Sequence, residues 1–182
     1  MVNVKYVYGR ADELVKMYAT HDPFELCEDL HINIKYKDLG NSLKAFYFYQ
    51  SRIKNIVINS RILEPMQKVL CAHELGHAIL HGKTTTKAFR EIELFDSALP
   101  AECEANLFAA EVLIDDHELL ELFSYSDASF FNIAKQLYVP AELLDFKLRI
   151  LQHKGYKFNS PIISRSDFLK NDMSEYFIVD NE

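Results

Sequence analysis

The sequence has few cysteines, no long apolar run and fewer basic than acidic residues. Its three cysteines, Cys27, Cys71 and Cys103, follow no regular spacing, which excludes a disulfide framework and fits a reducing compartment. No apolar run reaches the roughly 20 residues that span a bilayer. The N-terminus lacks the apolar segment and small-residue cleavage site of a secretory signal. We therefore expect a cytoplasmic protein that does not associate with a membrane.

The shortage of basic residues argues against nucleic acid as a partner. The chain holds 27 acidic and 20 basic residues, for a formal net charge of −7. Because phosphate binding requires a basic surface, we expect no direct binding of nucleic acid. Cationic stretches such as "KGYK" at 154–157 are short and fit solvated positions.

Internal repeats and low-complexity linkers are also absent. The 182 residues, of which 49% are hydrophobic, suit one domain with a sizeable core. We predict a single domain over residues 1–155 that includes a C-terminal helical pair. Residues 156–182 are interpreted as a tail that either wraps the domain or is loosely ordered.

Hydrophobic periodicity and turn-forming residues predict a mainly helical chain with one small sheet. Strands are expected at 32–36, 43–49 and 55–59, and the turn-formers "DLGNS" and "SRIK" between them favour an antiparallel meander. Helices are expected at 11–19, 22–31, 64–81, 101–114, 117–123, 126–139 and 140–156. The pattern indicates an α+β fold, mostly helical, with a three-stranded antiparallel sheet.

The stretch "CAHELGHAILH" at 71–81 carries the chemistry of the chain. His73 and His77 stand one helical turn apart, about 6 Å, on nearly the same face, so both imidazoles can bind a single cation. Glu74 projects about 100° further around the helix, from where it reaches a water molecule on the metal rather than the metal itself. This is the H-E-x-x-H arrangement of zinc peptidases.

The apolar setting of this motif favours a metal site over a solvated helix face. Leu75, Ala78, Ile79 and Leu80 surround the polar residues, so burying them buries two imidazoles and a carboxylate as well. Such groups are costly to bury without partners, and a metal ion would satisfy them together. We therefore predict a bound zinc ion, with Glu74 as the catalytic base.

His81 continues the series but is not expected to be a ligand. Along a straight helix His73 and His81 are about 12 Å apart. One ion with bonds near 2 Å cannot reach both. We expect His81 to line the site or to pack at the helix end.

The stretch "AECEANLFAA" at 101–110 offers a third ligand. On a helix Glu102 and Asn106 share a face, so the carboxylate can bind metal while the amide oxygen accepts a hydrogen bond from a ligating histidine. Glu104, about 200° around the helix from Glu102, and Glu111 remain alternative ligands. Glu102 could also be a solvated charge that the dipole of a helix start stabilises. Cys71 and Cys103 are interpreted as small packing residues, since neither has a partner at ligand spacing.

"HELGHAILHG" followed by "AECEANLFAAEVLI" resembles the ImmA/IrrE family of metallopeptidases. The resemblance covers roughly residues 11–114 well and the later helices loosely. It implies a zincin-like core, zinc held by His73, His77 and Glu102, and Glu74 as the catalytic glutamate, and it favours Glu102 over Glu104. The family often continues with leucine-leucine-methionine-proline after the alanines, whereas this chain has "VLID" at 112–115.

The resemblance also implies a substrate class. Family members often accompany phage or integrative elements and cleave a helix-turn-helix repressor. The expected function is therefore a zinc-dependent endopeptidase that cleaves such a repressor and derepresses the genes it controls. The alternative is a non-proteolytic antirepressor that sequesters the repressor through a zinc-stabilised domain. The last helical pair has a helix-turn-helix cadence, but its few basic residues favour packing on the core or contact with a protein partner over DNA binding.

The sequence leaves two features undecided: which group stabilises the oxyanion and where an extended substrate binds. Candidates for stabilising the oxyanion are Tyr47, Tyr49 and His117. The predicted strand "LKAFYFY" at 43–49 could present an edge on which an extended substrate adds as a further strand, although most of its aromatic side chains are expected to pack within the sheet.

Overall fold

The structure is a computed structural model that describes residues 2–82, 99–124 and 129–156. The chain adopts the predicted α+β fold, in which helices predominate. Apart from its first residue, the predicted tail at 156–182 lies outside the described residues, and the domain boundary at residue 155 stays a prediction. The elements run in this order: α1 (Val4–Tyr18), α2 (Pro23–Asp29), β1 (Asn33–Lys37), β2 (Ala45–Gln50), β3 (Ile53–Asn59), α3 (Glu64–Leu80), α4 (Pro100–Leu113), α5 (Asp116–Ser124), α6 (Phe130–Gln136) and α7 (Ala141–His153).

The first two helices begin at capping side chains. The Asn3 side chain accepts a hydrogen bond from the Tyr6 backbone N–H, so α1 begins seven residues before the predicted Ala11. The predicted Asp22 cap is confirmed, because its carboxylate accepts from the Phe24 backbone N–H. Each side chain satisfies a backbone donor that has no partner within its helix.

The sheet is mixed, so the prediction of a purely antiparallel meander was wrong. Its strand order is β1-β3-β2, with β3 parallel to β1 and antiparallel to β2. The connection after β1 crosses to the far edge, and a two-residue turn at Ser51 and Arg52, both at positive φ, brings the chain back into the centre. The physical reason is burial: β3 is buried from Asn55 to Asn59, whereas β1 is mostly exposed. The most buried strand therefore takes the central position.

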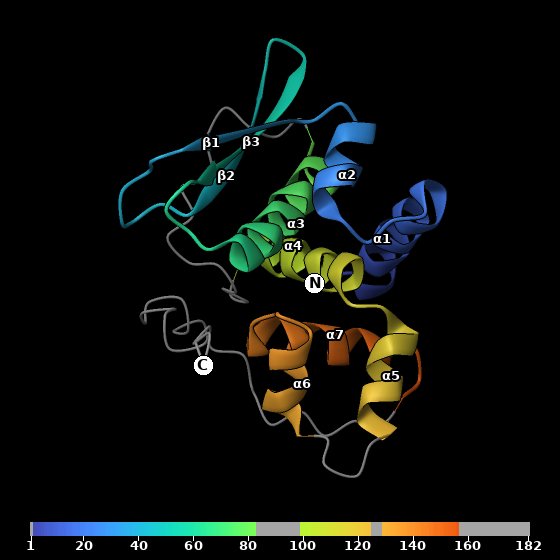
Figure 1. Cartoon of the computed structure of the whole chain (residues 1–182). Coiled ribbons are helices and arrows are strands. Elements are labelled where there is room, and N and C mark those ends of the chain that lie inside the picture. Colours follow the sequence, from blue (N-terminus) through green and yellow to red (C-terminus); the bar gives the residue numbers. More distant parts are fainter. Residues whose placement is uncertain (1, 83–98, 125–128, 157–182) are drawn as a thin grey trace, which may run out of the picture.

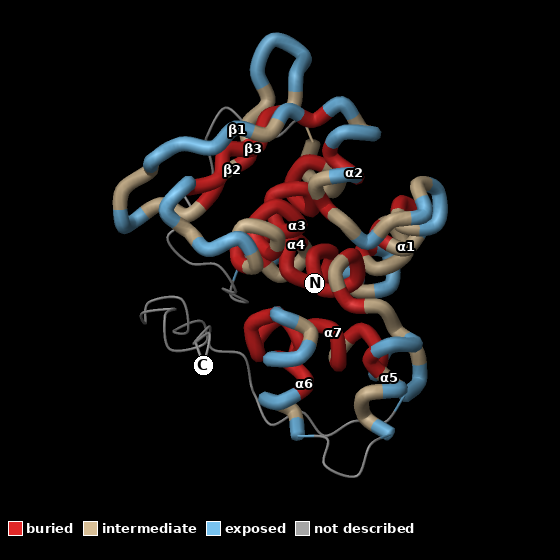
Figure 2. The backbone as a smooth tube through the Cα atoms, viewed as in Figure 1, coloured by how far each residue is buried: buried red, intermediate tan, exposed pale blue. Residues whose placement is uncertain are grey.

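Helix α3 is the centre of the molecule. It packs against β2 and β3 on one side and against α2 and α4 on others, while α4 in turn contacts α1 and α7. Figure 1 shows the sheet on one side of α3 and α5 to α7 beyond α4. Buried residues concentrate along α3, α4, α7 and the central strand β3, which are largely red in Figure 2.

Both central helices are apolar nearly all round, as buried helices are. Each has proline in its first turn, Pro65 in α3 and Pro100 in α4, where the missing N–H costs nothing. They approach closely at Gly76, where an added Cβ would lie 3.1 Å from Ala105 Cα, 3.2 Å from the Ala105 carbonyl oxygen and 3.2 Å from Phe108 Cβ. The glycine inside the H-E-x-x-H motif therefore sets the separation of the two helices.

A partly buried ion cluster ties the C-terminal helix to this centre. The Lys147 ammonium lies 2.6 Å from a carboxylate oxygen of Glu111 and 2.6 Å from one of Asp116. Lys154 lies 2.7 Å from Glu111 and 2.5 Å from Asp116. Both cations lie on or directly after α7, and the carboxylates lie on α4 and α5, so these charges hold three helices in register.

Membrane insertion finds no support among the described residues. Within 2–82, 99–124 and 129–156, no helix combines the length and the apolar character needed to cross a bilayer.

We expect Gly76→Ala to lower the free energy of unfolding by about 1–2 kcal/mol. Overpacking a well-packed contact costs about 1–3 kcal/mol, and the higher helix propensity of alanine returns at most about 1 kcal/mol of it. The neighbours that must move are largely backbone atoms of α4, so the strain cannot relax through one side chain. Urea denaturation of the two proteins measures the difference.

Gly9→Ala is the matched control, because Gly9 lies within α1 and nothing lies within 4 Å of the added Cβ. This change should raise the free energy of unfolding by about 0.5–1 kcal/mol through helix propensity alone. A Gly76→Ala protein as stable as Gly9→Ala would show that α3 and α4 are not in tight contact.

Candidate metal centre

Three side chains converge where α3 and α4 cross. His73 Nε2 lies 3.1 Å from His77 Nε2, and the same oxygen of Glu102 lies 3.2 Å from the first nitrogen and 3.4 Å from the second. All three side chains are buried. Among the described residues this is the group of histidine, cysteine and acidic side chains whose ligand atoms lie close enough together to hold a metal ion.

The spacing of the three donor atoms fits a tetrahedral ion. Ligands at about 2.0–2.1 Å with tetrahedral angles stand about 3.3 Å from one another, and the observed separations are 3.1, 3.2 and 3.4 Å. Two imidazole nitrogens and one carboxylate oxygen are also a donor set that zinc accepts. The residues present therefore fit a metal ion both in geometry and in chemistry.

The environment keeps His77 and Glu102 in the protonation states that metal binding needs. Burial lowers the pKa of His77 to about 4, so its imidazole is neutral at pH 7. Burial opposes ionisation of Glu102, but the neighbouring His73 and His77 rings outweigh it and hold its pKa well below the usual range. Neutral imidazoles and an ionised carboxylate bind a cation without first losing a proton.

Asn106 lies beside His73. Its Oδ1 atom is 2.8 Å from His73 Nδ1, and both side chains are buried. An oxygen in this place accepts the Nδ1–H of the ring and leaves the Nε2 lone pair directed at the other two donors. The helix spacing from Glu102 to Asn106 thus brings one possible ligand and one supporting group to the same place.

Glu74 is fully buried beside this group, and neither of its carboxylate oxygens makes a hydrogen bond of normal geometry. Burial raises its pKa well above the ordinary value, and the negative charge of Glu102 raises it further. The Tyr47 backbone N–H, directed at Glu74 from β2, lowers the pKa only in part. A carboxyl group with a raised pKa and no permanent partner can both accept and deliver a proton.

The structure places the alternative ligands elsewhere. Glu104 contacts His81, whose Nε2 lies 3.0 Å from Glu104 Oε2, and Glu111 belongs to the ion cluster with the two lysines. Cys71 Sγ lies 3.9 Å from Cys27 Sγ within the core.

The structure gives each candidate for oxyanion stabilisation a position of its own. The Tyr47 hydroxyl donates to the Gly82 carbonyl oxygen at 2.8 Å, and His117 is exposed on α5. Tyr49 is half-buried further along β2.

Sequence reasoning missed two features here, the Tyr47 backbone N–H beside Glu74 and the contact of His81 with Glu104. The position of the Tyr47 N–H depends on β2 lying at the sheet edge, and the contact of His81 with Glu104 joins two helices. Neither feature therefore leaves a pattern in the sequence.

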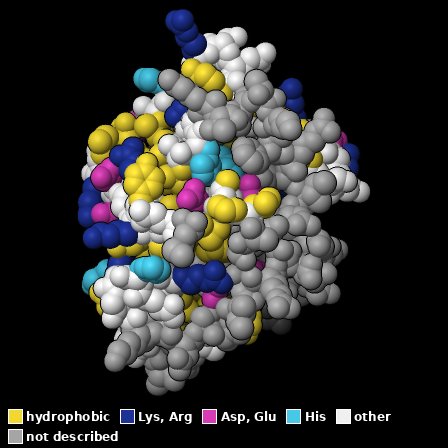
Figure 3. Space-filling model, turned by 180° about the vertical axis from the view of Figure 1, so that it is seen from behind, with side chains coloured by type: hydrophobic (Ala, Val, Ile, Leu, Met, Phe, Trp, Pro, Cys, Tyr) yellow, Lys and Arg dark blue, Asp and Glu magenta, His cyan; other side chains and the backbone are white. Residues whose placement is uncertain are grey.

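The rear face of the molecule is mixed in character. In Figure 3, which views the molecule from behind, histidine side chains lie near the middle of the face with acidic and hydrophobic side chains around them.

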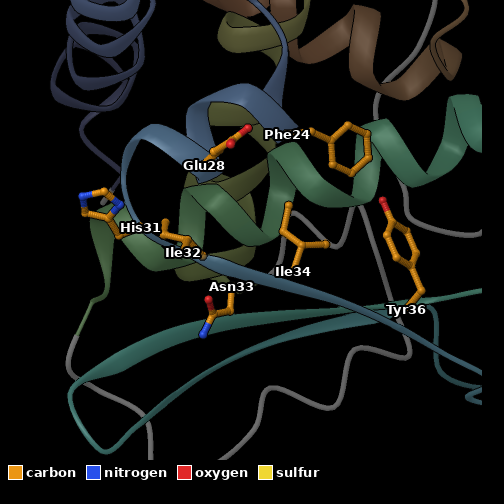
Figure 4. Close-up of a pocket in the computed structure, with 7 residues that line it drawn as sticks. All are labelled: Phe24, Glu28, His31, Ile32, Asn33, Ile34 and Tyr36. Carbon is orange, nitrogen blue, oxygen red and sulfur yellow. The ribbon is translucent and has the colours of Figure 1, made fainter.

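A separate surface pocket of about 510 Å³ lies between α2 and β1 and is lined by residues that include Phe24, His31 and Tyr36. Figure 4 shows these side chains around the pocket. None of the three converging side chains belongs to it, so it is distinct from the metal centre.

We expect Glu74→Gln to stabilise the metal-free protein, and to do so more as pH rises. A folded-state pKa above the ordinary value of 4.5 means that the folded state binds the proton more tightly than the unfolded state. Wild type therefore loses stability as pH rises from about 4.5 toward the folded pKa, whereas glutamine does not titrate. The gain should therefore be larger at pH 8 than at pH 5, as measured by urea denaturation at both pH values.

Glu64→Gln, an exposed change in the first turn of the same helix, is the control and should give no gain that grows with pH. Equal stability differences for Glu74→Gln at the two pH values would contradict the raised pKa.

Comparison with known proteins identifies the family to which the chain belongs. The family model described as the IrrE N-terminal-like domain, Peptidase M78, matches residues 27–149, which include both α3 and α4. The chain is 38% identical over 141 residues to "Uncharacterized immunity region protein 2" of Bacillus phage phi105, covering 78% of this chain and 88% of that protein. It is 29% identical over 146 residues to "Metallopeptidase ImmA" of Bacillus subtilis (strain 168), covering 79% and 85%. With its site residues inside the matched region and these likenesses spanning most of each protein, the chain belongs to the IrrE N-terminal-like family of peptidases.

Proposed function

We propose that this chain is a zinc-dependent endopeptidase of the cytoplasm that cleaves a helix-turn-helix repressor and thereby derepresses phage or mobile-element genes. One observation carries the enzymatic part. Two imidazoles and an ionised carboxylate converge on one point, beside the buried carboxyl group of Glu74. The names of the relatives, a metallopeptidase and an immunity region protein, support the reaction and its phage context.

His73, His77 and Glu102 would hold the zinc ion. When bound, zinc polarises a scissile carbonyl group and makes a water molecule more acidic. The two imidazoles come from one rigid helix and the carboxylate from the helix packed against it. The contact of α3 with α4 therefore sets the geometry of the ligands.

Glu74 would move the protons. As general base it accepts a proton from the attacking water, and as general acid it delivers that proton to the leaving amine. Its burial supports this role, because a raised pKa brings the two protonation states closer in energy near neutral pH. Nothing in the described structure ties the carboxylate to a fixed partner of normal hydrogen-bond geometry.

Strand β2 supports a peptide as the substrate. It lies at an edge of the sheet and packs against α3. The Asn59 N–H donates to the Lys44 carbonyl oxygen at 2.8 Å, and paired residues alternate along an antiparallel ladder. Phe46 and Phe48 therefore direct their backbone groups toward β3, whereas Tyr47 directs its N–H and C=O away from it. An extended segment that adds to this edge would lie next to Glu74.

This arrangement restricts where a substrate can be cut. Only extended backbone can add to a strand edge, and a folded helix has already used its N–H and C=O groups. The cut in a helix-turn-helix repressor should therefore fall in a linker or a locally unfolded stretch. Binding of nucleic acid by the chain itself forms no part of this proposal, and its absence stays a prediction from the net charge of −7.

We expect one zinc ion per chain in protein purified without added metal. His73→Ala, His77→Ala and Glu102→Ala should each reduce the bound metal at least about tenfold, because each removes one of three protein ligands. Elemental analysis after desalting measures the content. His153→Ala, an exposed histidine at the end of α7, should keep wild-type metal, and metal retention by the three site variants would show that the site is wrongly assigned.

We expect Glu74→Gln to bind zinc and the repressor but to leave the repressor intact. The amide keeps the shape of the side chain and cannot accept the proton of water, so cleavage should fall at least about a hundredfold. The test co-expresses the chain with repressors encoded near its gene, with an immunoblot for repressor length and a reporter for repression. Glu64→Gln serves as the control that should cleave like wild type.

The same experiment separates the enzyme from the antirepressor. If Glu74→Gln relieves repression as well as wild type does while the repressor stays full length, the protein acts by sequestering its partner and proteolysis is excluded as its mode of action.

A further inference from the structure

A second line of polar contacts leads from His77 away from the converging donor atoms. His77 Nδ1 lies 3.1 Å from His81 Nδ1, and His81 Nε2 lies 3.0 Å from Glu104 Oε2. The first contact joins two residues one turn apart at the end of α3, and the second joins α3 to α4. His81 and Glu104 are partly buried, with side-chain exposures of 16% and 27%.

These contacts determine which nitrogens carry protons. An ionised carboxylate only accepts hydrogen bonds, so Glu104 fixes a proton on His81 Nε2. In neutral His81 the Nδ1 atom is then bare and accepts a hydrogen bond, so the proton it accepts belongs to His77 Nδ1. The remaining nitrogen of His77, Nε2, is left with a free lone pair, and it is this atom that lies among the metal-site donors.

The opposite assignment is incompatible with metal binding. If His81 carried a proton on Nδ1, His77 Nδ1 would have to accept it. The proton of a neutral His77 would then sit on Nε2, directed at His73 and Glu102. Glu104 thus selects, through His81, the tautomer of His77 that can bind a cation.

We propose that His81 and Glu104 are positioning residues of the metal centre, which hold His77 in its metal-binding tautomer and orientation and so strengthen metal binding. This inference rests on the metal site of the proposed function. It gives each histidine of the H-E-x-x-H motif its own support from α4. Asn106 holds His73 directly, and Glu104 holds His77 through His81.

The backbone around His81 is fixed in a way that suits this role. His81 is the C-cap of α3, and its backbone N–H donates to the His77 carbonyl oxygen at 3.0 Å. The next residue, Gly82, accepts a hydrogen bond from the buried Tyr47 side chain at 2.8 Å. The His81 ring is therefore presented from an anchored helix end, which gives it a defined position relative to His77.

The test is the zinc dissociation constant of the full chain, measured by competition with a chromophoric chelator. His81→Ala and Glu104→Gln should each weaken zinc binding about 10- to 100-fold, the usual effect of losing a group that supports a ligand, while still binding one ion at saturation. His81→Asn should recover part of the loss, because its side-chain oxygen can occupy the place of Nδ1 and accept from His77. His153→Ala and Glu64→Gln, both exposed, should bind like wild type.

A second readout distinguishes positioning from general packing. Nitrogen-15 NMR of the histidine rings in the zinc-loaded protein should show His81 protonated at Nε2 and His77 at Nδ1. In Glu104→Gln the population of the His81 Nε2–H form should fall, and a purely structural effect would not change it.

The outcomes are separable from those of the proposed function. Wild-type affinity in both His81→Ala and Glu104→Gln overturns this inference, and so does loss of zinc from His81→Ala even at saturation, which would make His81 a ligand. Undiminished affinity in His73→Ala would instead overturn the metal site itself.

Discussion

The close contact between α3 and α4 is the constraint on which the rest of the structure depends. Gly76 lets the backbone of Ala105 approach, and only at this separation do side chains from both helices meet as donors around one point. The contact also buries a carboxyl group and two imidazoles that would otherwise face water. The apolar surface of both helices supplies the free energy that offsets the cost of this burial.

Burial then gives the two glutamates of the site different properties. The Nε2 atoms of both histidines lie close to Glu102 and hold its pKa below the ordinary value despite its burial. Glu74 receives no comparable support, and its pKa rises. The same residue type can therefore act as an anionic ligand in one place and as a proton carrier in the other, because the neighbouring donors differ.

The helix α4 connects the site to the rest of the chain. One of its faces carries Glu102 and Asn106, Glu104 contacts the end of α3, and Glu111 joins the lysines of the C-terminal region. The sheet contributes at the other side of α3, where β2 brings the Tyr47 backbone N–H to Glu74. A site on two packed helices and a strand edge combines fixed ligands with an edge where a peptide can pair.

The sequence by itself determined which segments form helices and which residues lie close to one another along each helix. The spacing of His73 and His77, and of Glu102 and Asn106, follows from 3.6 residues per turn, so both pairs could be identified without coordinates. Only the tertiary structure decided the parallel pairing of β1 with β3 and the contact between His81 and Glu104. The order of the strands, and the faces that two helices turn toward each other, depend on which apolar surfaces are buried together. Segments distant in the sequence compete for this burial, and that competition leaves no local pattern in the chain.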